Sequence, residues 1–470
     1  FFFKQKTAYE IRNCDWSSDV CSSDLPKTFG VYTVTGSAEA GWRQFTVDGS
    51  LNKFRSDLNY QRGARLLSFD FLAHTDEANG KGFDTLRINA FGWGGDPSAY
   101  LRVGAEKNKW YRFDGTYRRF DYFNNLANFA LNQHIQDSER KLGDFELTLL
   151  PQNNHIKFNL GYSLDQDRGT ALTTYDYARD EFAVFSPLRS VANEYRIGVD
   201  ARILGIDLSF LQGFRYFKED TTYVIPSISQ GNNPNNLSVI SALQRQLPTR
   251  GRIPFTRFSL HRLLARKLDF TGQFIYTSAT TRFSFNETIA GTDASGNTVK
   301  SDQFTTRGTA KRPSGMGDVG VSYYATDKLT ISETFRVHTF RINGSEVLSE
   351  ALYRTRTTPF GVTELPPLLT DFLAIRSTGY RQFQNTIEAD YKFSPKLMGH
   401  LGYRFTDRRL IVGSFDEGID PALQQEVSRN QTHSVFIGFK AAPVSIWKLY
   451  FDAERGTADN VFTRVDKIGR

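Results

Sequence analysis

Cysteine is almost absent from this chain. Its 470 residues include two cysteines, Cys14 and Cys21, and both lie within the first 25 residues. Taken at face value, the pair indicates a disulfide or half of a metal site, which is the weaker interpretation. The remaining residues contain no cysteine, and this excludes both a disulfide framework and a c-type haem attachment motif within them.

Residues 1–25 do not share the pattern of the rest of the chain. They resemble translated sequencing-adapter sequence at the start of an open reading frame. A secretory signal peptide would need an apolar run of about 7–15 residues, and charged residues interrupt every such run here. We therefore predict a non-native or artefactual leader over 1–25, with any true export signal lost, and a single domain over 26–470. The interrupting charges are Lys4, Lys6, Glu10, Arg12 and Asp15.

Long apolar runs are also missing. No stretch approaches the roughly 18 uncharged apolar residues of a membrane helix, and the mean hydropathy is negative. Neither sign of charge is in large excess, since 58 Lys and Arg stand against 51 Asp and Glu, for a net charge of +7. These charges are scattered, whereas a nucleic-acid-binding protein concentrates its basic residues in a stripe. We therefore expect no nucleic-acid partner.

The chain has instead a sequence period of two. In the segment 110–119, WYRFDGTYRR, apolar side chains alternate with charged ones. Only an extended strand has this side-chain period, so the segment separates an apolar face from a charged face. The same alternation recurs near residues 156–165, 195–203 and 383–393. Long strands of this kind fit between lipid on one side and water on the other, which is typical of a transmembrane β-barrel.

The alternation assigns individual residues to two predicted faces. Aromatic residues make up 14% of the chain, and outer-membrane barrels place such residues in girdles at the membrane interfaces. The charged residues could form a selectivity lining, although solvating the lumen wall and pairing with neighbours is the favoured role. The predicted lipid-facing or girdle residues are Tyr111, Phe113, Tyr117, Phe158, Tyr162, Tyr195, Tyr391, Phe393, Tyr403, Phe405, Trp447 and Phe451. The predicted lumen-facing residues are Arg112, Asp114, Arg118, Lys157, Arg196, Asp200, Arg202, Glu388, Asp390 and Lys392.

Strand-like segments continue from about residue 28 to residue 453. We expect about 16–18 strands, most near the 9–11 residues that a tilted membrane strand needs. Short turns alternate with polar stretches of roughly 20–45 residues, as periplasmic turns alternate with extracellular loops in outer-membrane barrels. The predicted short turns lie at 107–109, 151–155, 204–205, 265–267, 325–328, 394–396 and 441–445. The predicted long loops cover 120–143, 166–193, 218–254, 278–317, 342–381 and 407–431.

The predicted fold is therefore all-β: a large antiparallel up-and-down transmembrane β-barrel in a bacterial outer membrane, in contact with outer-membrane lipid. Residues 460–466 begin another strand pattern, and the sequence stops at Arg470. We expect the barrel to be truncated at this C-terminus, so that 26–470 is a fragment.

Motifs for catalysis or cofactor binding are weak. His338, His400 and His433 lie on or at strands, and no segment supplies the serine or aspartate partner that a barrel hydrolase needs at one rim. Residues 165–169 resemble half of a calcium loop but lack its third carboxylate and its distant Glu. The glycine-rich segment 92–97 lacks the Lys-Ser/Thr of a phosphate-binding loop and is expected to form a turn or sheet bend. We predict no enzymatic activity, no metal site and no cofactor of its own.

One region resembles a known family. The run Gly-Trp-Gly-Gly-Asp-Pro at 92–97, Tyr-Leu-Arg at 100–102 and Trp-Tyr-Arg-Phe-Asp at 110–114 is similar to decahaem-associated outer-membrane barrels of the MtrB/PioB type and to related acidobacterial barrels. The resemblance implies a wide barrel that sheathes a multihaem cytochrome partner and supports electron transfer across the outer membrane. Members often carry a Cys-x-x-Cys near their start, and this chain has none after Leu25.

The first functional prediction is a porin-like channel for the passive passage of small solutes. The first alternative is the cytochrome sheath that the resemblance implies. A TonB-dependent receptor barrel lacking its plug is the second alternative, since strands begin here by about residue 30–70 and leave no room for a plug. A large soluble antiparallel protein, such as a lectin or a propeller, is a further possibility, although no blade-length repeat is present.

Overall fold

A single antiparallel sheet forms nearly the whole molecule. The computed structural model describes residues 27–75, 79–125, 134–417, 420–444 and 446–466. Twenty strands belong to one sheet, and one short helix, α1 (Leu51–Asp57), lies beside it. None of the helices in these residues has the length and apolar character that crossing a membrane requires. The predicted all-β, antiparallel up-and-down architecture is confirmed.

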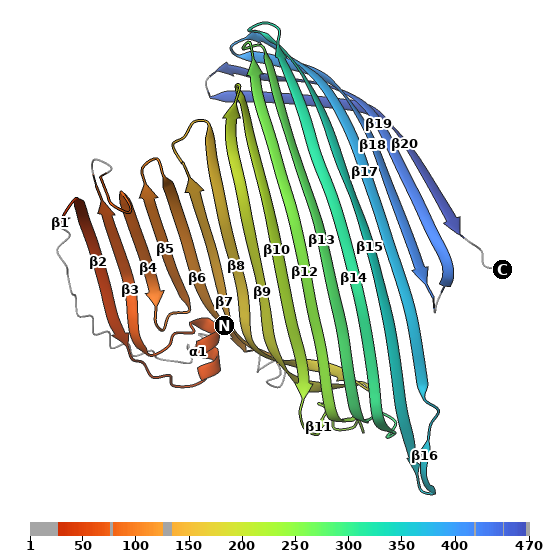
Figure 1. The fold of residues 1–470 in the computed structure, drawn as a ribbon. Coiled ribbons are helices and arrows are strands. Elements are labelled where there is room, and N and C mark those ends of the chain that lie inside the picture. Colours follow the sequence, from red (N-terminus) through yellow and green to blue (C-terminus); the bar gives the residue numbers. More distant parts are fainter. Residues whose placement is uncertain (1–26, 76–78, 126–133, 418–419, 445, 467–470) are drawn as a thin grey trace, which may run out of the picture.

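The strands follow one another along the chain (Figure 1). They are β1 (Lys27–Phe29), β2 (Tyr32–Arg43), β3 (Gly63–His74), β4 (Thr85–Trp93), β5 (Ser98–Lys107), β6 (Tyr111–Asn125), β7 (Ile135–Leu149), β8 (Ile156–Tyr177), β9 (Asp180–Ile203), β10 (Ile206–Ile225), β11 (Ser229–Gln230), β12 (Val239–Leu264), β13 (Leu268–Thr292), β14 (Thr298–Tyr324), β15 (Leu329–Thr358), β16 (Gly361–Glu364), β17 (Leu368–Ser394), β18 (Leu397–Asp416), β19 (Asp420–Val444) and β20 (Trp447–Asp466).

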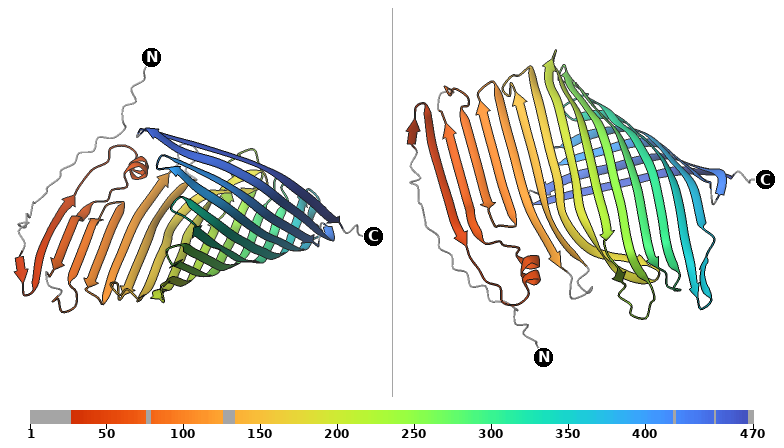
Figure 2. Two further views of the ribbon diagram at one scale, coloured as in Figure 1. Left: turned by 90° about the horizontal axis from the view of Figure 1, so that it is seen from above. Right: turned by 60° about the horizontal axis from the view of Figure 1, so that its bottom comes forward.

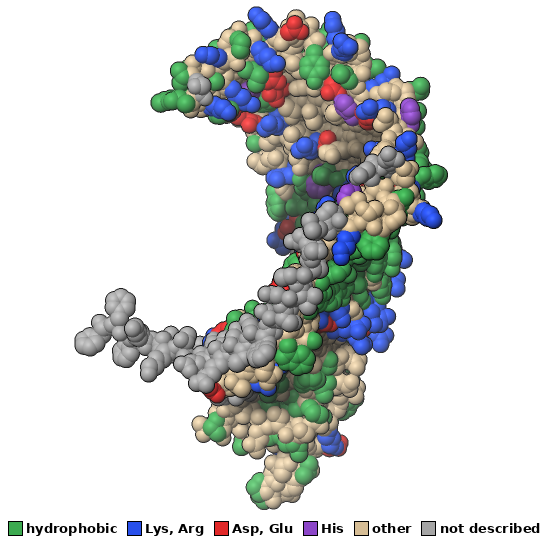
Figure 3. Space-filling model, turned by 90° about the vertical axis from the view of Figure 1, so that its left-hand side faces the viewer, with side chains coloured by type: hydrophobic (Ala, Val, Ile, Leu, Met, Phe, Trp, Pro, Cys, Tyr) green, Lys and Arg blue, Asp and Glu red, His purple; other side chains and the backbone are tan. Residues whose placement is uncertain are grey.

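The sheet is a meander in which successive long strands pair. Three of the twenty strands, β1, β11 and β16, have two to four residues, which leaves 17 long strands, within the predicted 16–18. Strand β10 pairs with β12, and β15 pairs with β17, so β11 and β16 are short additions inside connections. Within the described residues no pairing joins β20 to β1 or β2. The sheet is accordingly a curved, open trough (Figures 2 and 3).

Six of the seven predicted short turns are confirmed, and they gather at one end of the sheet, which we call the short-turn end (Figure 1). The seventh, predicted at 441–445, is displaced, because β19 continues to Val444; residue 445 lies outside the described residues. The tightest joins β9 to β10 through Leu204 and Gly205, whose φ angles are 54° and 77°. Two positive φ values in a two-residue connection match the twist of the flanking strands, as in a type I′ hairpin. Glycine takes such an angle without strain, whereas leucine does so rarely.

The predicted long loops are wrong in kind. Their described residues are mostly strand, because the paired strands continue past the alternating segments and form long hairpins at the opposite, long-hairpin end. Residues 126–133 and 418–419 of the predicted loops lie outside the described residues. The predicted loop 166–193 is reduced to Ala178 and Arg179, with β8 and β9 on either side. β15 has 30 residues, about 100 Å of extended chain. Apolar and polar residues alternate along a strand only where one face of the sheet is apolar and the other is polar. Where both faces are polar the alternation disappears, although the backbone hydrogen bonds between the strands continue.

The connection between β2 and β3 contains α1, which the sequence did not reveal. Ser50 caps the helix, since its hydroxyl accepts a hydrogen bond from Lys53 N at 3.3 Å. Phe54 is buried and packs against Phe45 in a tilted arrangement, with ring centroids 4.9 Å apart. The Arg55 guanidinium reaches across to β7. A helix of seven residues is too short to show a 3.6-residue period.

The predicted turn at 92–97 is present between β4 and β5.

Phenylalanine rings cover glycines on neighbouring strands. In these pairs a glycine and a phenylalanine are directly opposite, and a Cβ atom on the glycine would meet the ring at 2.1–2.8 Å. Such contacts let a large ring lie flat over the backbone of the next strand, and they fix the register of the pair. The pairs are Gly115–Phe145, Gly213–Phe255, Gly251–Phe217, Gly308–Phe283 and Gly402–Phe436.

We predict that Gly308→Ala lowers the free energy of unfolding by about 1–3 kcal/mol, because the new methyl group overlaps Phe283 Cζ at 2.3 Å. Gly315→Ala in the same strand is the matched control, since its nearest side-chain contact is an ordinary 3.6 Å to Thr339. Urea unfolding in detergent micelles measures both. Equal losses for the two variants would show that ring packing over glycine does not matter.

Candidate functional site

The two predicted sets of residues lie on opposite faces of the sheet. In an antiparallel pair, directly opposite residues share a face, so the register follows each face from strand to strand. Tyr111 is opposite Leu149, which is opposite Phe158. In this way all the predicted lipid-facing residues fall on one face, the apolar face, and all the predicted lumen-facing residues fall on the other, the polar face. What each face contacts stays a prediction.

The apolar face carries a band of exposed hydrophobic side chains beside the short turns. In this band Phe274 is 47% exposed, Val319 54% and Leu401 54%. On the five strands whose ranges follow, the band covers about nine to eleven residues, the length of strand that crosses a hydrocarbon layer. We call it the apolar band. On five strands it covers residues 268–276, 315–323, 329–337, 383–393 and 397–405.

The polar face carries a charged network centred on Arg196. Its guanidinium contacts Asp144 at 2.8 Å, Glu194 at 2.9 Å and Glu146 at 3.6 Å. Glu194 also pairs with Arg215 at 3.1 Å. The side chains of Arg196 and Glu194 are less than one-fifth exposed. Their charges are therefore neutralised mainly by each other and by charged side chains of the neighbouring strands.

This network borders a recess in the middle of the polar face. The recess has a volume of 720 Å³, within the range of small-molecule sites. Charged and apolar side chains from β7 to β13 line it, so it offers both carboxylates and guanidinium groups to a polar solute. Lining residues include Glu146, Glu194, Arg196, Arg215, Arg257 and Phe255. We call it the polar-face recess.

Only Arg196 of this charged network belongs to the predicted lumen-facing residues. The other members, which were not predicted, are Asp144, Glu146, Glu194 and Arg215. The first two alternate with Phe145 and Leu147 along β7, so the same period of two would have found them. The period of two does not predict which of these residues form ion pairs with each other, because the pairs join different strands and depend on the register between them.

Several of the other predicted polar-face residues pair with their neighbours. Arg102 Nη2 contacts Asp114 at 2.7 Å, and Arg112 contacts Glu106 at 3.3 Å. Asp200 accepts hydrogen bonds from Asn159 at 2.7 Å and from Ser209 at 2.6 Å, and Arg202 binds Asp207. These contacts agree with the favoured role of pairing across strands. The remaining predicted residues of this set are Arg118, Lys157 and Lys392.

Glu388, Asp390 and His400 form a second group on the polar face. One ligand atom from each lies within 4.8 Å of the others, an arrangement that could hold a metal ion. Asp390 and His400 are directly opposite each other on β17 and β18. His400 Nε2 also lies 2.9 Å from Asp452 Oδ1. A set of carboxylates and an imidazole is compatible with several divalent metals. The sequence predicts no metal site, and the register between β17 and β18 is what brings these three residues together.

At the long-hairpin end, the tip of the β8–β9 hairpin packs against β10, β12 and β13. The buried side chains Phe182, Val184, Ile225, Ile240, Leu243 and Ile289 form this hairpin-tip cluster. Polar contacts hold its rim: Asp180 accepts hydrogen bonds from Asn233 N at 2.9 Å and Ser238 Oγ at 3.3 Å.

Two partly buried tyrosines of the tip, Tyr175 and Tyr177, pack against this cluster. The Tyr175 hydroxyl donates to Glu287 at 3.0 Å, and Arg245 lies 4.6 Å from its ring centroid. Tyr177 has no hydrogen-bond partner for its hydroxyl among the described residues. Burial, followed by the nearby carboxylates of Asp293 and Asp302, raises the pKa of Tyr177 to about 12. The neutral form of this side chain is therefore the one that the folded hairpin accommodates.

Comparisons with known proteins give no family. No protein-family model and no curated protein match the chain. Among solved structures, the ferric yersiniabactin uptake receptor FyuA from Yersinia pestis matches 98% of this chain and 81% of its own length, at 8% identity and a TM-score of 0.38. For the ferric citrate transporter FecA, the values are 93%, 77%, 9% and 0.30. For the ferric-catecholate import receptor Fiu from E. coli K12, they are 92%, 81%, 8% and 0.29.

All these TM-scores lie below 0.5, so the fold assignment rests on the sheet itself and not on these likenesses. None of the comparisons bears on the resemblance to decahaem-associated barrels, which stays a prediction.

We predict that Tyr177→Phe is nearly neutral at about pH 8, because no hydrogen bond is lost. An unfolded tyrosine has a pKa near 10, so between about pH 10 and pH 12 only the unfolded state of the wild type releases this proton. The wild type should therefore lose stability relative to Tyr177→Phe over that interval. Unfolding midpoints in detergent, measured for both chains across this pH range, give the difference. A difference that does not change with pH would contradict the burial of the Tyr177 hydroxyl.

Proposed function

We propose that this chain is the wall of an outer-membrane β-barrel that lets small polar solutes pass through the bacterial outer membrane. The observation that carries the proposal is the division of the sheet into two faces. The apolar band runs beside the short turns at about the width of a bilayer core, and the opposite face carries paired charges. A membrane-spanning sheet must satisfy its backbone through neighbouring strands, and the strands between the two edges of this sheet do so.

The proposed orientation places the short-turn end in the periplasm and the long-hairpin end outside the cell. Outer-membrane barrels have short periplasmic turns and larger extracellular connections. The strands here extend well beyond the apolar band on the long-hairpin side, so the wall would rise above the membrane surface. The hairpin-tip cluster gives this extension a packed core of its own.

The polar-face recess is the proposed solute-contacting region. Its carboxylates and guanidinium groups come from β7 to β13, at the level of the apolar band on β9 and β10. Fixed charges that line a water-filled path select among ions by sign. The predicted lumen-facing role of Arg196 and its neighbours belongs to this proposal.

The cytochrome sheath is the second candidate function. The motif at 92–114 favours it, because this is the segment that resembles decahaem-associated barrels. Its cargo would be a multihaem cytochrome seated against the polar face. A TonB-dependent receptor remains a third reading; the likeness to solved receptors is too low to support it.

We predict that the purified chain shows heat-modifiable migration in detergent gels, because a closed or oligomeric membrane sheet stays folded in the detergent until it is heated. Extraction should require detergent, since the apolar band is exposed along many strands. Migration that does not depend on heating, together with solubility without detergent, would favour a soluble β protein.

We predict that Glu146→Gln with Glu194→Gln shifts the permeability ratio of the channel toward anions by at least about twofold. Two carboxylates leave the recess, so Arg196 keeps only Asp144 of its three carboxylate partners and Arg215 loses Glu194. Single-channel recordings in planar bilayers measure the ratio.

The matched control is Glu364→Gln with Asp371→Asn, which removes the same charge from the long-hairpin end. It should leave the ratio unchanged. An equal shift in both double variants would remove the recess from the conduction path. Absence of conductance with haem bound to the native complex would favour the sheath, whereas open conductance without haem would rule against it.

A further inference from the structure

Basic residues lie directly beyond the apolar band on the apolar face, on the side of the long hairpins. On β10 this face changes from Tyr216 to Lys218, and on β17 it changes from Phe383 to Arg381. The change from aromatic to cationic takes two residues along one strand. This inference rests on the membrane placement proposed above. In that placement the apolar band contacts hydrocarbon, so these cations lie at the level of the lipid headgroups.

The cations form rows across neighbouring strands. The register places Lys218 of β10 opposite Arg250 of β12, and Arg250 opposite Arg282 of β13. Like charges directly opposite each other destabilise an antiparallel pair, so such a row needs an anion to neutralise it. A second row, with each member again opposite the next, consists of Arg381, Arg409 and Arg429.

The two arginines of the first row lack the carboxylates that neutralise cations elsewhere in the sheet. Lys218 reaches Asp220 at 2.5 Å. Across the described part of the chain, Arg250 and Arg282 make no hydrogen bond or ion pair, and both are exposed. On the polar face, by contrast, Arg196 contacts three carboxylates. The missing counter-charge of the first row must therefore come from outside the described residues.

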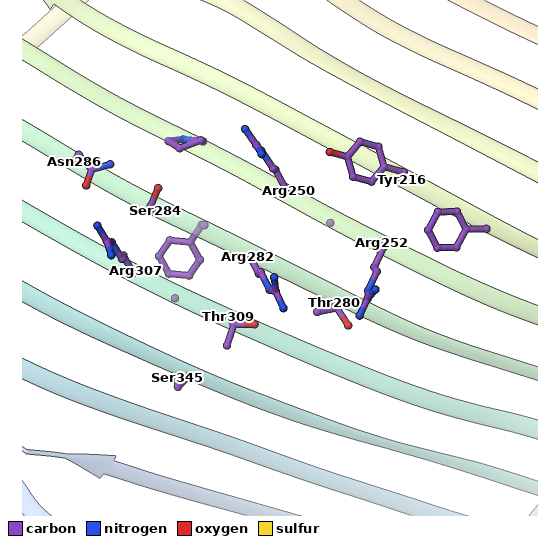
Figure 4. A pocket seen from close by; sticks show the side chains of 15 residues that line it. Tyr216, Arg250, Arg252, Thr280, Arg282, Ser284, Asn286, Arg307, Thr309 and Ser345 are labelled. Atoms are coloured by element: carbon purple, nitrogen blue, oxygen red, sulfur yellow. The ribbon is translucent and has the colours of Figure 1, made fainter.

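A recess of 1030 Å³ opens at this row (Figure 4). Four arginines from β12, β13 and β14 surround it, and hydroxyl groups lie between them. Two glycines, Gly251 and Gly308, contribute no side chain to its floor. We call it the cationic recess. Its polar lining includes Arg250, Arg252, Arg282, Arg307, Tyr216, Thr280, Ser284, Thr309 and Asn286.

This chemistry fits a phosphate group. A guanidinium binds phosphate oxygens through two parallel N–H donors, and hydroxyl groups supply further hydrogen bonds. Arg307 is opposite Ser284 in the sheet register, so a guanidinium and a hydroxyl approach from adjacent strands. The recess also includes Phe214, which continues into the apolar band. A ligand that fills both parts carries phosphate at one end and hydrocarbon at the other.

We propose that the cationic recess binds the phosphorylated headgroup of an anionic lipid in the leaflet on the long-hairpin side, with the acyl chains lying along the apolar band below it. The occupant is a lipid rather than a soluble phosphate, because the recess is continuous with an exposed hydrophobic surface. The second row, in which Asp407 binds Arg429 at 2.9 Å and Phe383 supports Arg381, is a weaker site of the same kind.

The test is native mass spectrometry of the full chain in detergent, titrated with phosphatidic acid and, separately, with phosphatidylcholine. The recess variant replaces Arg250, Arg282 and Arg307 with glutamine. The matched control replaces Arg266, Lys267 and Lys328 with glutamine, which removes the same charge at the short-turn end. We expect the recess variant to bind phosphatidic acid at least about tenfold more weakly, and the control to bind it as the wild type does.

Heat-modifiable migration of both variants shows that they are folded. Equal binding by the recess variant and the wild type, or equal weakening in the control, would overturn the proposal. So would displacement of the bound lipid by an excess of inorganic phosphate, which would indicate a site for free anions. Conductance is read separately: a wild type that binds lipid through the recess but conducts no ions would contradict the channel and support the lipid site.

Discussion

The hydrogen-bond ladder between neighbouring strands is the constraint on which the rest of this structure depends. Each long strand between the two edges of the sheet pairs with the strands beside it, and this pairing continues for up to 30 residues in β15. A backbone satisfied in this way can face lipid, water or a packed cluster without change. The same ladder fixes which residues are opposite each other, and therefore which charges meet.

The two faces use their charges differently. On the polar face, the register sets guanidinium groups against carboxylates from adjacent strands, and Arg196 with Glu194 and Asp144 is the densest example. On the apolar face, the register sets cations against cations at Arg250 and Arg282. The first arrangement is neutralised within the sheet, whereas the second calls for an external anion. The proposed solute path and the proposed lipid contact therefore lie on opposite faces of the same sheet.

The long hairpins give the sheet a second region with its own stability. The cluster around Phe182 and Leu243 is among the most deeply buried parts of the described molecule, although it lies far from the apolar band. The β8–β9 tip reaches it by crossing toward β12 and β13, where Tyr175 meets Glu287. Such packing holds the long-hairpin extension in one conformation. In the orientation that we propose, this packed extension forms the extracellular entrance of the channel.

The sequence by itself determined the all-β class, the face of each alternating residue and the positions of the short turns, because these follow from a side-chain period of two and from local turn chemistry. It could not determine the length of the hairpins, since alternation disappears where both faces are polar. Only the tertiary structure decided that Asp390 lies opposite His400, that Glu194 forms an ion pair with Arg215, and that Arg250 lies opposite Arg282. These are matters of register between strands, and register depends on the pairing of whole strands rather than on any one segment.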